Sequence, residues 1–511
     1  MQNMISAISK RYLELILIFL IIFAVTVVFM RTLDSDFVRW DDGTNITQNP
    51  FLTHGISIQN LAWMFSDTSY MRRWVPLSWL VWNADFTISG LNPRLFHFNN
   101  LFIHIANTVL VFLIIRRLLF VLDDLAGVRK PKRLLVVCAA IGALLWAIHP
   151  LRVEVVAWVS GYMYGQALFF LLISALSYLY YVAMPGANGK KKMLYGVSVA
   201  AFAASLLTYP IALAFPIVLV ILDIYPLLRL GVSWKNWKNA ETQNVFVEKI
   251  PFFAIAISVF AVTLRARIHA GAFWGRPPSL ETFGVTDRIA QAFYMWARFL
   301  WKTLWPMNLS PVYTALVTFN PLGFPFALSA LAVIVVTIVL WLKRFQYKGI
   351  FAVWFAHLVI LIPFLGLTEH PYYPSDRYSY VVSVIWAVPL AAALSMIWSW
   401  WGGSARVLRA LGLFGVLCLA AWWSILSFQQ IYVWKNSETL FRYMITELGD
   451  NPYRSDILWR LGVFLADNGR YEEAIKNLSL AVKINPRNPL PRVLLQLVLK
   501  KSEQDRQIHV K

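Results

Sequence analysis

Apolar stretches about as long as a lipid bilayer is thick recur along most of this 511-residue chain. A helix needs about 20 mainly apolar residues to cross the hydrocarbon core of a membrane. Hydrophobic residues make up 59% of the sequence and charged residues only 14%, whereas a soluble domain has about 45–50% apolar and about 25% charged residues. This balance excludes a soluble globular protein, a disordered chain and a disulfide scaffold. It predicts an all-α, polytopic membrane protein.

The apolar segments predict about 11 transmembrane helices by the length criterion. They lie at residues 12–30, 98–118, 134–149, 164–184, 193–208, 211–228, 251–264, 324–342, 350–367, 378–398 and 407–429.

Basic residues between these segments set the predicted orientation, because cytoplasmic loops are enriched in Lys and Arg. With Lys10 and Arg11 inside, every second loop is basic and falls on the same side. These inner residues are Arg116, Arg117, Arg129, Lys130, Lys132, Arg133, Lys190, Lys191, Lys192, Lys235, Lys238, Lys343, Arg344, Lys348, Arg406 and Arg409. The segment after residue 430 is then outside.

Arginine, rather than lysine, is the basic residue of the outer loops. Of the 12 lysines before residue 430, only Lys302 falls outside. The outer arginines are Arg31, Arg39, Arg72, Arg73, Arg94, Arg152, Arg265, Arg267, Arg276, Arg288, Arg298 and Arg377. Because a guanidinium group grips phosphate and carboxylate with two hydrogen bonds, this bias indicates an anionic ligand. Pairing with outer acids or with lipid headgroups is the alternative.

The composition divides the chain at about residue 430. Residues 1–430 form the predicted membrane domain, with large outer loops at about 31–97 and 265–323, and residues 431–511 have a soluble composition. The stretch 455–488 matches one tetratricopeptide repeat, at Leu461, Gly462, Gly469, Tyr471, Ala474, Ala481 and Pro486. Since such repeats need about three copies for a continuous core, we expect a small helical appendage that docks as a cap. Acceptor binding is the alternative role.

Two apolar stretches in the outer loops are not predicted to span. NLAWMF, at 60–65, predicts a short helix on the membrane surface with Leu61, Phe65 and neighbouring tryptophans facing lipid. Arg298 and Lys302 interrupt the helical stretch near 288–305, so we expect it to be interfacial or packed on the bundle.

Carboxylates cluster just beyond the ends of the predicted spans. Asp41 and Asp42 follow the first span, Glu154 the third, and Glu369 and Asp376 the ninth. Acids at the mouth of a membrane bundle are expected of a membrane-embedded active site, where a carboxylate can serve as a general base for a hydroxyl.

Seven segments in a characteristic order connect the chain to a known family. They are WDDGTNITQNP (40–50), WVPLSW (74–79), LNPRLFHFNNLFIHIAN (91–107), LLWAIHPLRVEVVAWVSG (144–161), FLWKTLWPMNLSPVY (299–313), SDRYSYV (375–381) and the C-terminal repeat. The chain resembles the transmembrane and tetratricopeptide-repeat glycosyltransferases of the GT-C superfamily along nearly its whole length. Its short C-terminal tail indicates a bacterial member.

The resemblance implies an inverting hexosyl- or pentosyltransferase with a GT-C fold. Such enzymes move a sugar from a polyprenyl phosphate to a hydroxyl of a protein or glycan on the extracytoplasmic face of the membrane. The expected place is the bacterial inner membrane, with active site and C-terminus in the periplasm. The general base maps to Asp41 or Asp42; we slightly favour Asp41, and a cap for the following turn is the alternative role of the second Asp.

The leaving phosphate needs a cationic partner, which arginine or a divalent cation can supply. Arg377, with Tyr378 beside it, is the first candidate, followed by Arg72, Arg73, Arg265 and Arg267. Snorkelling to the headgroups is the alternative for each arginine.

The second outer loop is expected to meet the first at the active site. His149 and Glu154 are interpreted as a metal ligand or a substrate hydrogen bond; alternatively, Glu154 pairs with Arg152 or Arg39 and organises the loop. We expect His97 near the site and His104 deeper, as a packing histidine.

Three charged positions of the family are replaced in this chain. Tyr162 and Tyr164 stand where relatives carry an R-x-D/E element, Tyr209 lies where a Lys-Glu pair is common, and Trp74 opens the family's Y-R-P-L. Aromatic rings stack on sugars or pack along a prenyl chain, so the three tyrosines are candidate substrate-binding residues, and a different sugar is compatible with them.

Two other functions are the alternatives. An oligosaccharide ligase would use a lipid-diphosphate donor. A lipid-linked glycan transporter would need mid-membrane charges and pseudo-symmetric halves, whereas the predicted spans contain few charges and no half-repeat occurs. The glycosyltransferase hypothesis requires Asp41, Asp42 and Arg377 to converge on one outer pocket. No clear metal-ligand spacing occurs, so the use of a divalent cation stays open, and nucleic acid is not an expected partner.

Overall fold

The fold comes from a computed structural model that describes residues 2–127, 129–186, 188–231, 237–269, 278–400 and 406–509. Lys235 and Arg276 lie outside these ranges. All regular secondary structure of the described residues is helical, as expected for segments that must satisfy every backbone hydrogen bond within a membrane.

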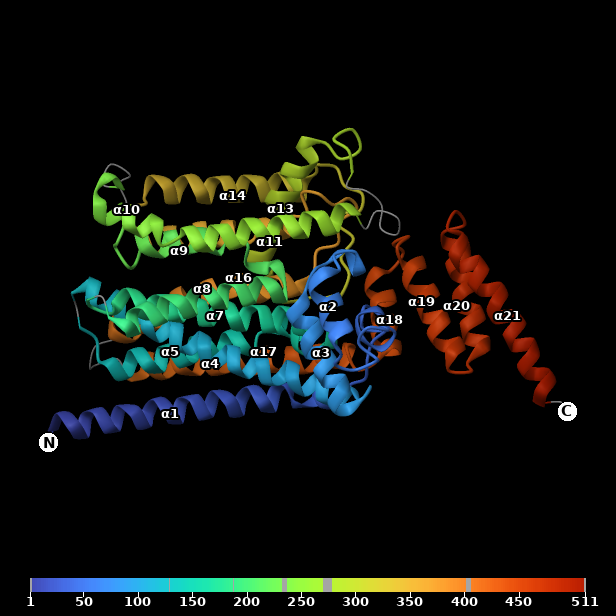
Figure 1. The fold of residues 1–511 in the computed structure, drawn as a ribbon, viewed down its shortest axis with the longest axis horizontal. Coiled ribbons are helices and arrows are strands. Elements are labelled where there is room, and N and C mark those ends of the chain that lie inside the picture. The colour runs from blue at the N-terminus through green and yellow to red at the C-terminus, as the bar shows by residue number, and fades with distance from the viewer. Residues whose placement is uncertain are drawn as a thin grey trace.

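The long helices lie side by side in a bundle with roughly parallel axes (Figure 1). They are α1 (Gln2–Phe29), α4 (Pro93–Ala126), α5 (Lys132–Ala147), α7 (Tyr162–Ala183), α8 (Gly189–Thr208), α11 (Ile250–His269), α14 (Phe324–Leu342), α16 (Ser379–Trp400) and α17 (Arg406–Val433).

Seven helical segments among the described residues are long and apolar enough to cross a membrane. They are Tyr12–Asp34, Pro93–Ala126, Val159–Ala183, Ala240–Ile268, Phe324–Leu342, Asp376–Ser399 and Arg406–Val433. An eighth candidate is the pair Lys132–Ala147 and Pro150–Ala157, bent by 60°. The chain is therefore a polytopic helical membrane protein, as predicted.

Three of the predicted spans form helices that do not meet the length and hydropathy requirement. Residues 193–208 lie in α8, 211–228 contain α9 (Phe215–Ile224) and 350–367 contain α15 (Lys348–Ile360). At 1.5 Å per residue, the 10 residues of α9 cover only about 15 Å. Pro216 is the second residue of α9 and Pro226 follows the helix, and proline restricts helix extension. Fewer helices than the predicted 11 thus qualify as full spans.

One end of the bundle carries both the first outer loop and the C-terminal helices (Figure 1). The loop contains α2 (Ile58–Ser66) and α3 (Pro76–Ser89), and the C-terminal helices are α18 (Ser437–Leu448), α19 (Arg454–Asp467), α20 (Tyr471–Ile484) and α21 (Pro489–His509). Ser78 Oγ of α3 donates to Thr208 O at the end of α8, at 3.0 Å. The lysine-rich start of α8 is therefore at the opposite end of the bundle.

Helix α13 (Val285–Leu304) packs along α14 and is not among the candidate spans. This agrees with the expectation that Arg298 and Lys302 keep it from crossing the membrane.

The prediction that the tryptophans near α2 face lipid is wrong. Trp63 is 9% exposed and stacks on Phe51, with ring centroids 4.2 Å apart. Tyr70 and Trp79 contact the same indole edge-on or tilted. Packing between aromatic rings stabilises this arrangement, and the spacing of residues along one helix does not predict it. Of the predicted pair Leu61 and Phe65, only Phe65 is largely exposed.

The C-terminal helices dock on the outer loops through backbone and side-chain hydrogen bonds. Asp36 N donates to Lys435 O at 2.8 Å, and Arg39 N donates to Ser437 Oγ at 2.9 Å. Tyr443 Oη donates to Leu309 O at 2.7 Å. The appendage is thus fixed to two outer loops.

Helices α19 and α20 pack closely at Gly462, where a Cβ atom would lie 2.7 Å from Leu478 Cγ. A small residue at this position is therefore required by the helix contact. The assignment of the pair as a tetratricopeptide repeat stays a prediction.

We predict that thiols at the two ends of the bundle react from opposite sides of the membrane. Asp450→Cys lies at the end with the appendage and Lys190→Cys at the lysine-rich end, and both positions are exposed. In a Cys418→Ser background, which removes the exposed native thiol, a membrane-impermeant maleimide should label Asp450→Cys in intact cells and Lys190→Cys only after permeabilisation. Labelling of both in intact cells would contradict the orientation.

Candidate functional site

A short irregular segment between α5 and α7 organises the outer end of the bundle. It consists of η4 (Pro150–Arg152), α6 (Val153–Ala157) and η5 (Val159–Gly161), and all of these residues are buried. At Gly161 a Cβ atom would lie 2.6 Å from Val155 O, so the turn admits only glycine without a shift of backbone. We call residues 149–164, which include the first turn of α7, the central segment.

Asp42 ties the first outer loop to the central segment. Its side chain is fully buried and accepts hydrogen bonds from Val38 N at 2.9 Å, Ser160 N at 3.0 Å and Ser160 Oγ at 2.5 Å. Burial raises the pKa of Asp42 to about 7, although these donors lower it. Both oxygens of the Asp42 carboxyl group accept hydrogen bonds, and they hold the first outer loop to the central segment.

Asp41 has a different environment from its neighbour. Its side chain is 27% exposed, and Oδ2 lies 3.7 Å from Arg73 Nη2. Arg73 also reaches the central segment, with Nη1 3.9 Å from Met163 Sδ. An accessible carboxylate beside a guanidinium group is therefore present at Asp41 and not at Asp42.

Glu154 and Arg377 form a buried ion pair. Arg377 Nη1 lies 2.6 Å from Glu154 Oε1, and Arg377 N donates to Glu154 Oε2 at 2.8 Å. The side chains are 5% and 15% exposed for the acid and the base. The predicted partners of Glu154 are wrong: Arg152 donates to Ser379 O and Oγ.

The other predicted partner, Arg39, pairs instead with Asp467 of α19. Both predicted partners of Glu154 were wrong because its actual partner, Arg377, is 223 positions away along the chain.

Aromatic rings surround the guanidinium group of Arg377. It lies over the rings of Trp158, Tyr164 and Tyr378 at 5.3, 5.6 and 5.2 Å, and its Nε donates to Tyr164 Oη at 3.0 Å. Tyr209 packs on Tyr164 with ring centroids 4.6 Å apart. The fold thus brings five predicted site residues together: Glu154, Tyr164, Tyr209, Arg377 and Tyr378.

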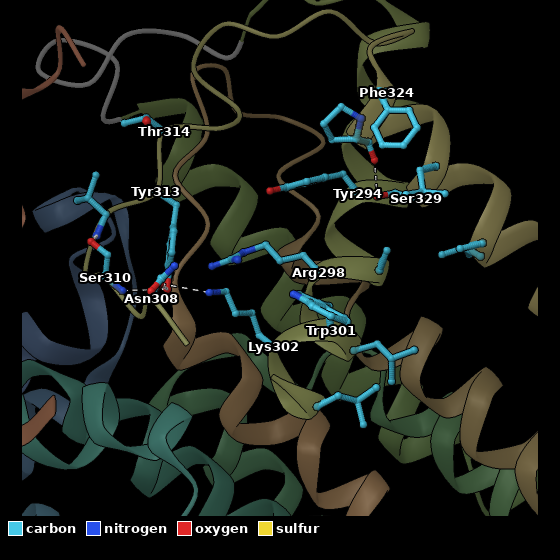
Figure 2. A pocket seen from close by; sticks show the side chains of 18 of the residues that line it. Tyr294, Arg298, Trp301, Lys302, Asn308, Ser310, Tyr313, Thr314, Phe324 and Ser329 are labelled. Atoms are coloured by element: carbon cyan, nitrogen blue, oxygen red, sulfur yellow. Dashed lines mark hydrogen bonds between the residues drawn. The ribbon is translucent and has the colours of Figure 1, made fainter. Parts of the chain in front are cut away.

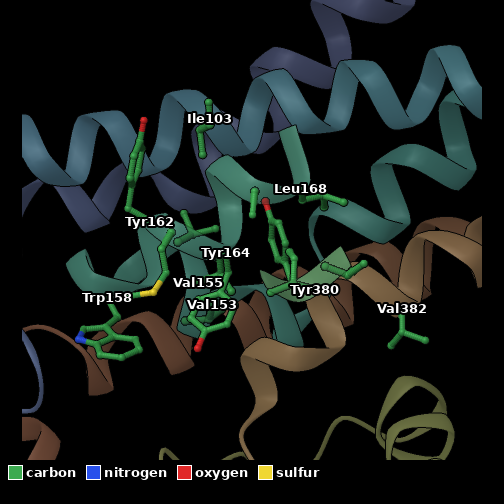
Figure 3. Close-up of a cluster of buried hydrophobic side chains, with 14 of the residues drawn as sticks. Ile103, Val153, Val155, Trp158, Tyr162, Tyr164, Leu168, Tyr380 and Val382 are labelled. Atoms are coloured by element: carbon green, nitrogen blue, oxygen red, sulfur yellow. The ribbon is translucent and has the colours of Figure 1, made fainter. Parts of the chain in front are cut away.

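Tyr162 lies apart from this group. It is buried, and Figure 3 shows it on the side of Ile103, whereas Trp158 and Tyr164 point the other way. Residues two positions apart on a helix face nearly opposite directions, so only one of the two predicted tyrosines of α7 joins Arg377.

A second group of arginines lies where α11 meets one turn of the first outer loop and one turn that follows α8. Arg267 forms an ion pair with Glu369, and α11 packs on η3 (Tyr70–Arg72) and η6 (Pro210–Ala212). Burial lowers the pKa of Arg72, while the charge of Glu369 raises it. Arg265, two positions before Arg267, is exposed.

The backbone that presents Arg72 is strained. Met71 and Arg72 have φ angles of 54° and 55°, which side chains other than glycine rarely adopt and which cost of order 1–3 kcal/mol each. Such strain persists only where the surrounding structure holds it, and it often marks functional sites.

The three histidines considered in the sequence, His97, His104 and His149, lie in packing contacts. His149 Nε2 lies 3.1 Å from Thr303 O and its Nδ1 accepts from Leu151 N, so both ring nitrogens are engaged. His97 is buried with Nε2 3.4 Å from Asp36 O. His104 is buried, as predicted, with Nδ1 2.8 Å from Tyr380 Oη.

No group of three or more His, Cys, Asp or Glu side chains that could hold a metal ion occurs within the described part of the chain. Use of a divalent cation stays open.

Asp41, Asp42 and Arg377 each connect to the central segment, Asp41 through Arg73. Asp42 binds Ser160, Arg73 connects Asp41 to Met163, and Arg377 contacts Trp158 and Tyr164. Residues 158–164 of the central segment thus contact all three groups. A single pocket shared by all three stays a prediction.

Sequence reasoning did not single out the cluster around Asp376. Tyr313 Oη donates to Asp376 Oδ2 at 2.6 Å, and Arg298 Nη2 lies 3.3 Å from Asp376 Oδ1. Arg298 and Tyr313 also line a cavity of about 840 Å³ (Figure 2). One signal was available in the sequence: Arg298 and Lys302 are spaced four apart and therefore share one face of a largely apolar helix.

We predict that Arg377→Met destabilises the protein by about 3–5 kcal/mol, because Glu154 is left buried without a cation. The double variant Glu154→Gln/Arg377→Met should recover a large part of that loss. Thermal unfolding in detergent measures both. Arg39→Met is the control, since its pair with Asp467 is 43% and 46% exposed and should contribute about 0–1 kcal/mol. Equal losses for Arg377→Met and Arg39→Met would contradict the buried pair.

The raised pKa of Asp42 predicts a pH dependence of stability. Between about pH 4 and about pH 7 the folded protein keeps a proton that the unfolded chain has released, so this group lowers the free energy of unfolding as pH rises. Asp42→Asn removes this contribution, and the Tm of the variant should change less over that window. Asp450→Asn, at a fully exposed position, should keep the wild-type slope. Identical slopes for wild type and Asp42→Asn would refute the assignment.

The chain is similar to protein O-mannosyl-transferases. It is 21% identical over 505 residues to Protein O-mannosyl-transferase TMTC1 of Homo sapiens, an alignment that covers 90% of this chain and 54% of the human protein. It is 31% identical over 158 residues to Protein O-mannosyl-transferase Tmtc1 of Drosophila melanogaster, covering 30% of this chain and 17% of the fly protein. The chain thus spans about half the length of the human relative and a smaller share of the fly protein.

No family model and no solved structure matches the chain. Similarity along nearly the whole chain to the human protein supports the resemblance to the transmembrane and tetratricopeptide-repeat glycosyltransferases.

Proposed function

We propose that this chain is a membrane glycosyltransferase of the GT-C type. It takes a sugar from a polyprenyl-phosphate donor and transfers it, with inversion, to a hydroxyl of a protein acceptor on the extracytoplasmic face. In a bacterium this face is the periplasmic side of the inner membrane.

The observation that carries the proposal is the extended similarity to a protein named an O-mannosyl-transferase. The position of the candidate residues supports it. Asp41, Arg73 and the aromatic group around Arg377 are all attached to the central segment, at the end of the bundle that holds the outer loop and the appendage.

Asp41 is the proposed general base. The acceptor oxygen attacks the anomeric carbon and forms the new C–O bond while the bond from that carbon to the phosphate oxygen breaks. The leaving phosphate keeps the electron pair, and the hydroxyl proton passes to the Asp41 carboxylate. Direct displacement from the opposite side inverts the anomeric configuration.

Asp42 is the proposed positioning residue for Asp41. Its three accepted hydrogen bonds hold residues 38–42 against Ser160, so its neighbour is presented from a fixed turn. This division of roles follows from burial, because a base must be reached by the acceptor hydroxyl and Asp42 is enclosed.

The charge of the leaving phosphate requires a cation with free hydrogen-bond donors. Arg377 directs its Nη1 and Nε atoms to Glu154 and Tyr164, so its first role is to hold the site together. Arg72 and Arg73 of the first loop and Arg267 of α11 are then the better candidates for phosphate contact, and Tyr164, Tyr209 and Tyr378 for stacking on the sugar or chain.

We predict that Asp41→Asn lowers transfer from a polyprenyl-phosphate sugar by about 10²–10⁴-fold, the usual contribution of a general base. The fold should be unchanged, because Asp41 makes only a long, partly exposed ion pair. The measurement is transfer of labelled sugar to endogenous acceptor proteins by purified membranes. Asp450→Asn, on the same side of the bundle, is the matched control and should retain full activity. Wild-type transfer by Asp41→Asn would remove this residue as the base.

A further inference from the structure

A cavity of about 840 Å³ lies between α13 and α14 and has one apolar wall and one charged side. Figure 2 shows Arg298, Lys302 and Tyr313 on one side of it and Phe324 and Ser329 of α14 on the other. None of these residues was a predicted site residue.

The cavity is separate from the residues proposed for the transfer reaction. Asp41, Arg72, Arg73, Arg267 and Arg377 do not belong to its described lining. A ligand in this cavity therefore lies away from the proposed base and from the proposed phosphate contacts, and it is not the substrate of that reaction.

The apolar wall of the cavity is open to lipid. Leu328, Ala332 and Val336 line it from α14, a candidate membrane span whose most apolar window is only 11% buried within the protein. From Phe324 to Val336 the helix rises about 18 Å. A hydrocarbon chain can therefore lie along α14 and enter the cavity from the bilayer.

The charged side of the cavity carries two cations with unused hydrogen-bond donors. Lys302 Nζ donates to the carbonyl oxygens of Met307 and Asn308, and an ammonium group has three donors. Among the described residues no carboxylate lies within ion-pair distance of Lys302. Arg298 pairs with Asp376 through Nη2, and its buried Nε has no hydrogen-bond partner within the described ranges. A phosphate group in the cavity would satisfy donors that the protein leaves unused.

The C-terminal appendage adds a negative charge to the same cavity. Glu447 of α18 lines it and is exposed. Burial lowers the pKa of Lys302, whereas the charges of Asp376 and Glu447 raise it, so the Glu447 carboxylate lies near enough to act on this lysine. Because Arg298 is paired with Asp376, the cavity keeps one positive and one negative charge, at Lys302 and Glu447. A ligand with one charge of each sign complements both, and a ligand with a net negative charge meets repulsion from Glu447.

We infer that this cavity binds a membrane phospholipid with a zwitterionic headgroup: an acyl chain lies along α14, the phosphate contacts Lys302 and Arg298, and the ammonium group contacts Glu447. Phosphatidylethanolamine fits this description, because its ammonium group donates hydrogen bonds and both Glu447 and Asn308 line the cavity with oxygen atoms that accept them. Such a lipid joins α13 and α14 of the membrane domain to α18 of the appendage, whether or not the chain transfers a sugar. The assignment therefore goes beyond the proposed function.

Photolabelling of the full-length protein in detergent micelles tests this assignment. The probe is a photoreactive phosphatidylethanolamine, and the competitors are phosphatidylethanolamine, phosphatidylglycerol with the same acyl chains, and inorganic phosphate. For the wild type we expect phosphatidylethanolamine to displace the probe at a concentration at least about tenfold lower than phosphatidylglycerol. Inorganic phosphate, which lacks the acyl chain, should require a higher concentration than either lipid.

Variants test the individual contacts. Glu447→Gln should remove the preference for phosphatidylethanolamine over phosphatidylglycerol. Glu472→Gln, at an exposed position of α20 outside the cavity lining, is the matched control and should keep the preference. Ala332→Trp fills the apolar wall and should weaken labelling at least about tenfold. Ala327→Trp, at a position that is exposed on α14 but outside the cavity lining, should be labelled like the wild type.

Equal displacement of the probe by the two phospholipids in the wild type would overturn the assignment. Displacement by inorganic phosphate at the concentration of phosphatidylethanolamine would assign a simple anion site and also overturn it. Unchanged lipid preference in Glu447→Gln, or unchanged labelling of Ala332→Trp, would contradict the corresponding contact. The competition in the wild type needs no variant, so it decides the matter even if a variant does not fold. Since labelling does not depend on transfer, a loss of the proposed enzymatic function would leave this result unchanged.

Discussion

The three hydrogen bonds that Asp42 accepts hold the outer end of this molecule together. Two of them join the loop after the first helix to Ser160, in the short segment between α5 and α7, and the third, from Val38 N, closes the loop on itself. A fully buried carboxylate is unfavourable without such donors, so the loop and the segment must form together. Arg73, beside Asp41, reaches this segment at Met163, and Arg377 with its aromatic neighbours packs on it at Trp158 and Tyr164.

The appendage extends the same arrangement outward. Arg460 of α19 lies over the ring of Trp40 at 5.3 Å, and Tyr453 packs on Tyr373. Trp40 directly precedes Asp41 and Asp42, so the C-terminal helices contact the residue next to the two aspartates. The single helix pair, too short for a solenoid of its own, is thereby stabilised by the membrane domain, and it covers both the loop of Asp41 and the cavity beside α13.

The sequence was sufficient for the class of fold. Hydropathy identified the long helices because a bilayer demands length and apolarity together, and it overestimated α9 and α15, where prolines shorten helices that remain apolar. It placed Asp41 and Asp42 beyond the first helix but could not tell their roles apart, since burial depends on Ser160, 118 positions away. The Glu154–Arg377 pair could not be predicted for the same reason, because its members lie 223 positions apart.

The stereochemistry of the product tests the central claim most directly. One accessible carboxylate acting as a base implies a single displacement, so transfer from a polyprenyl-phosphate donor of defined anomeric configuration should give a glycosylated protein of the opposite configuration, determined by NMR of the released glycopeptide. Retention of configuration would require a covalent intermediate and a second displacement, and it would contradict the account.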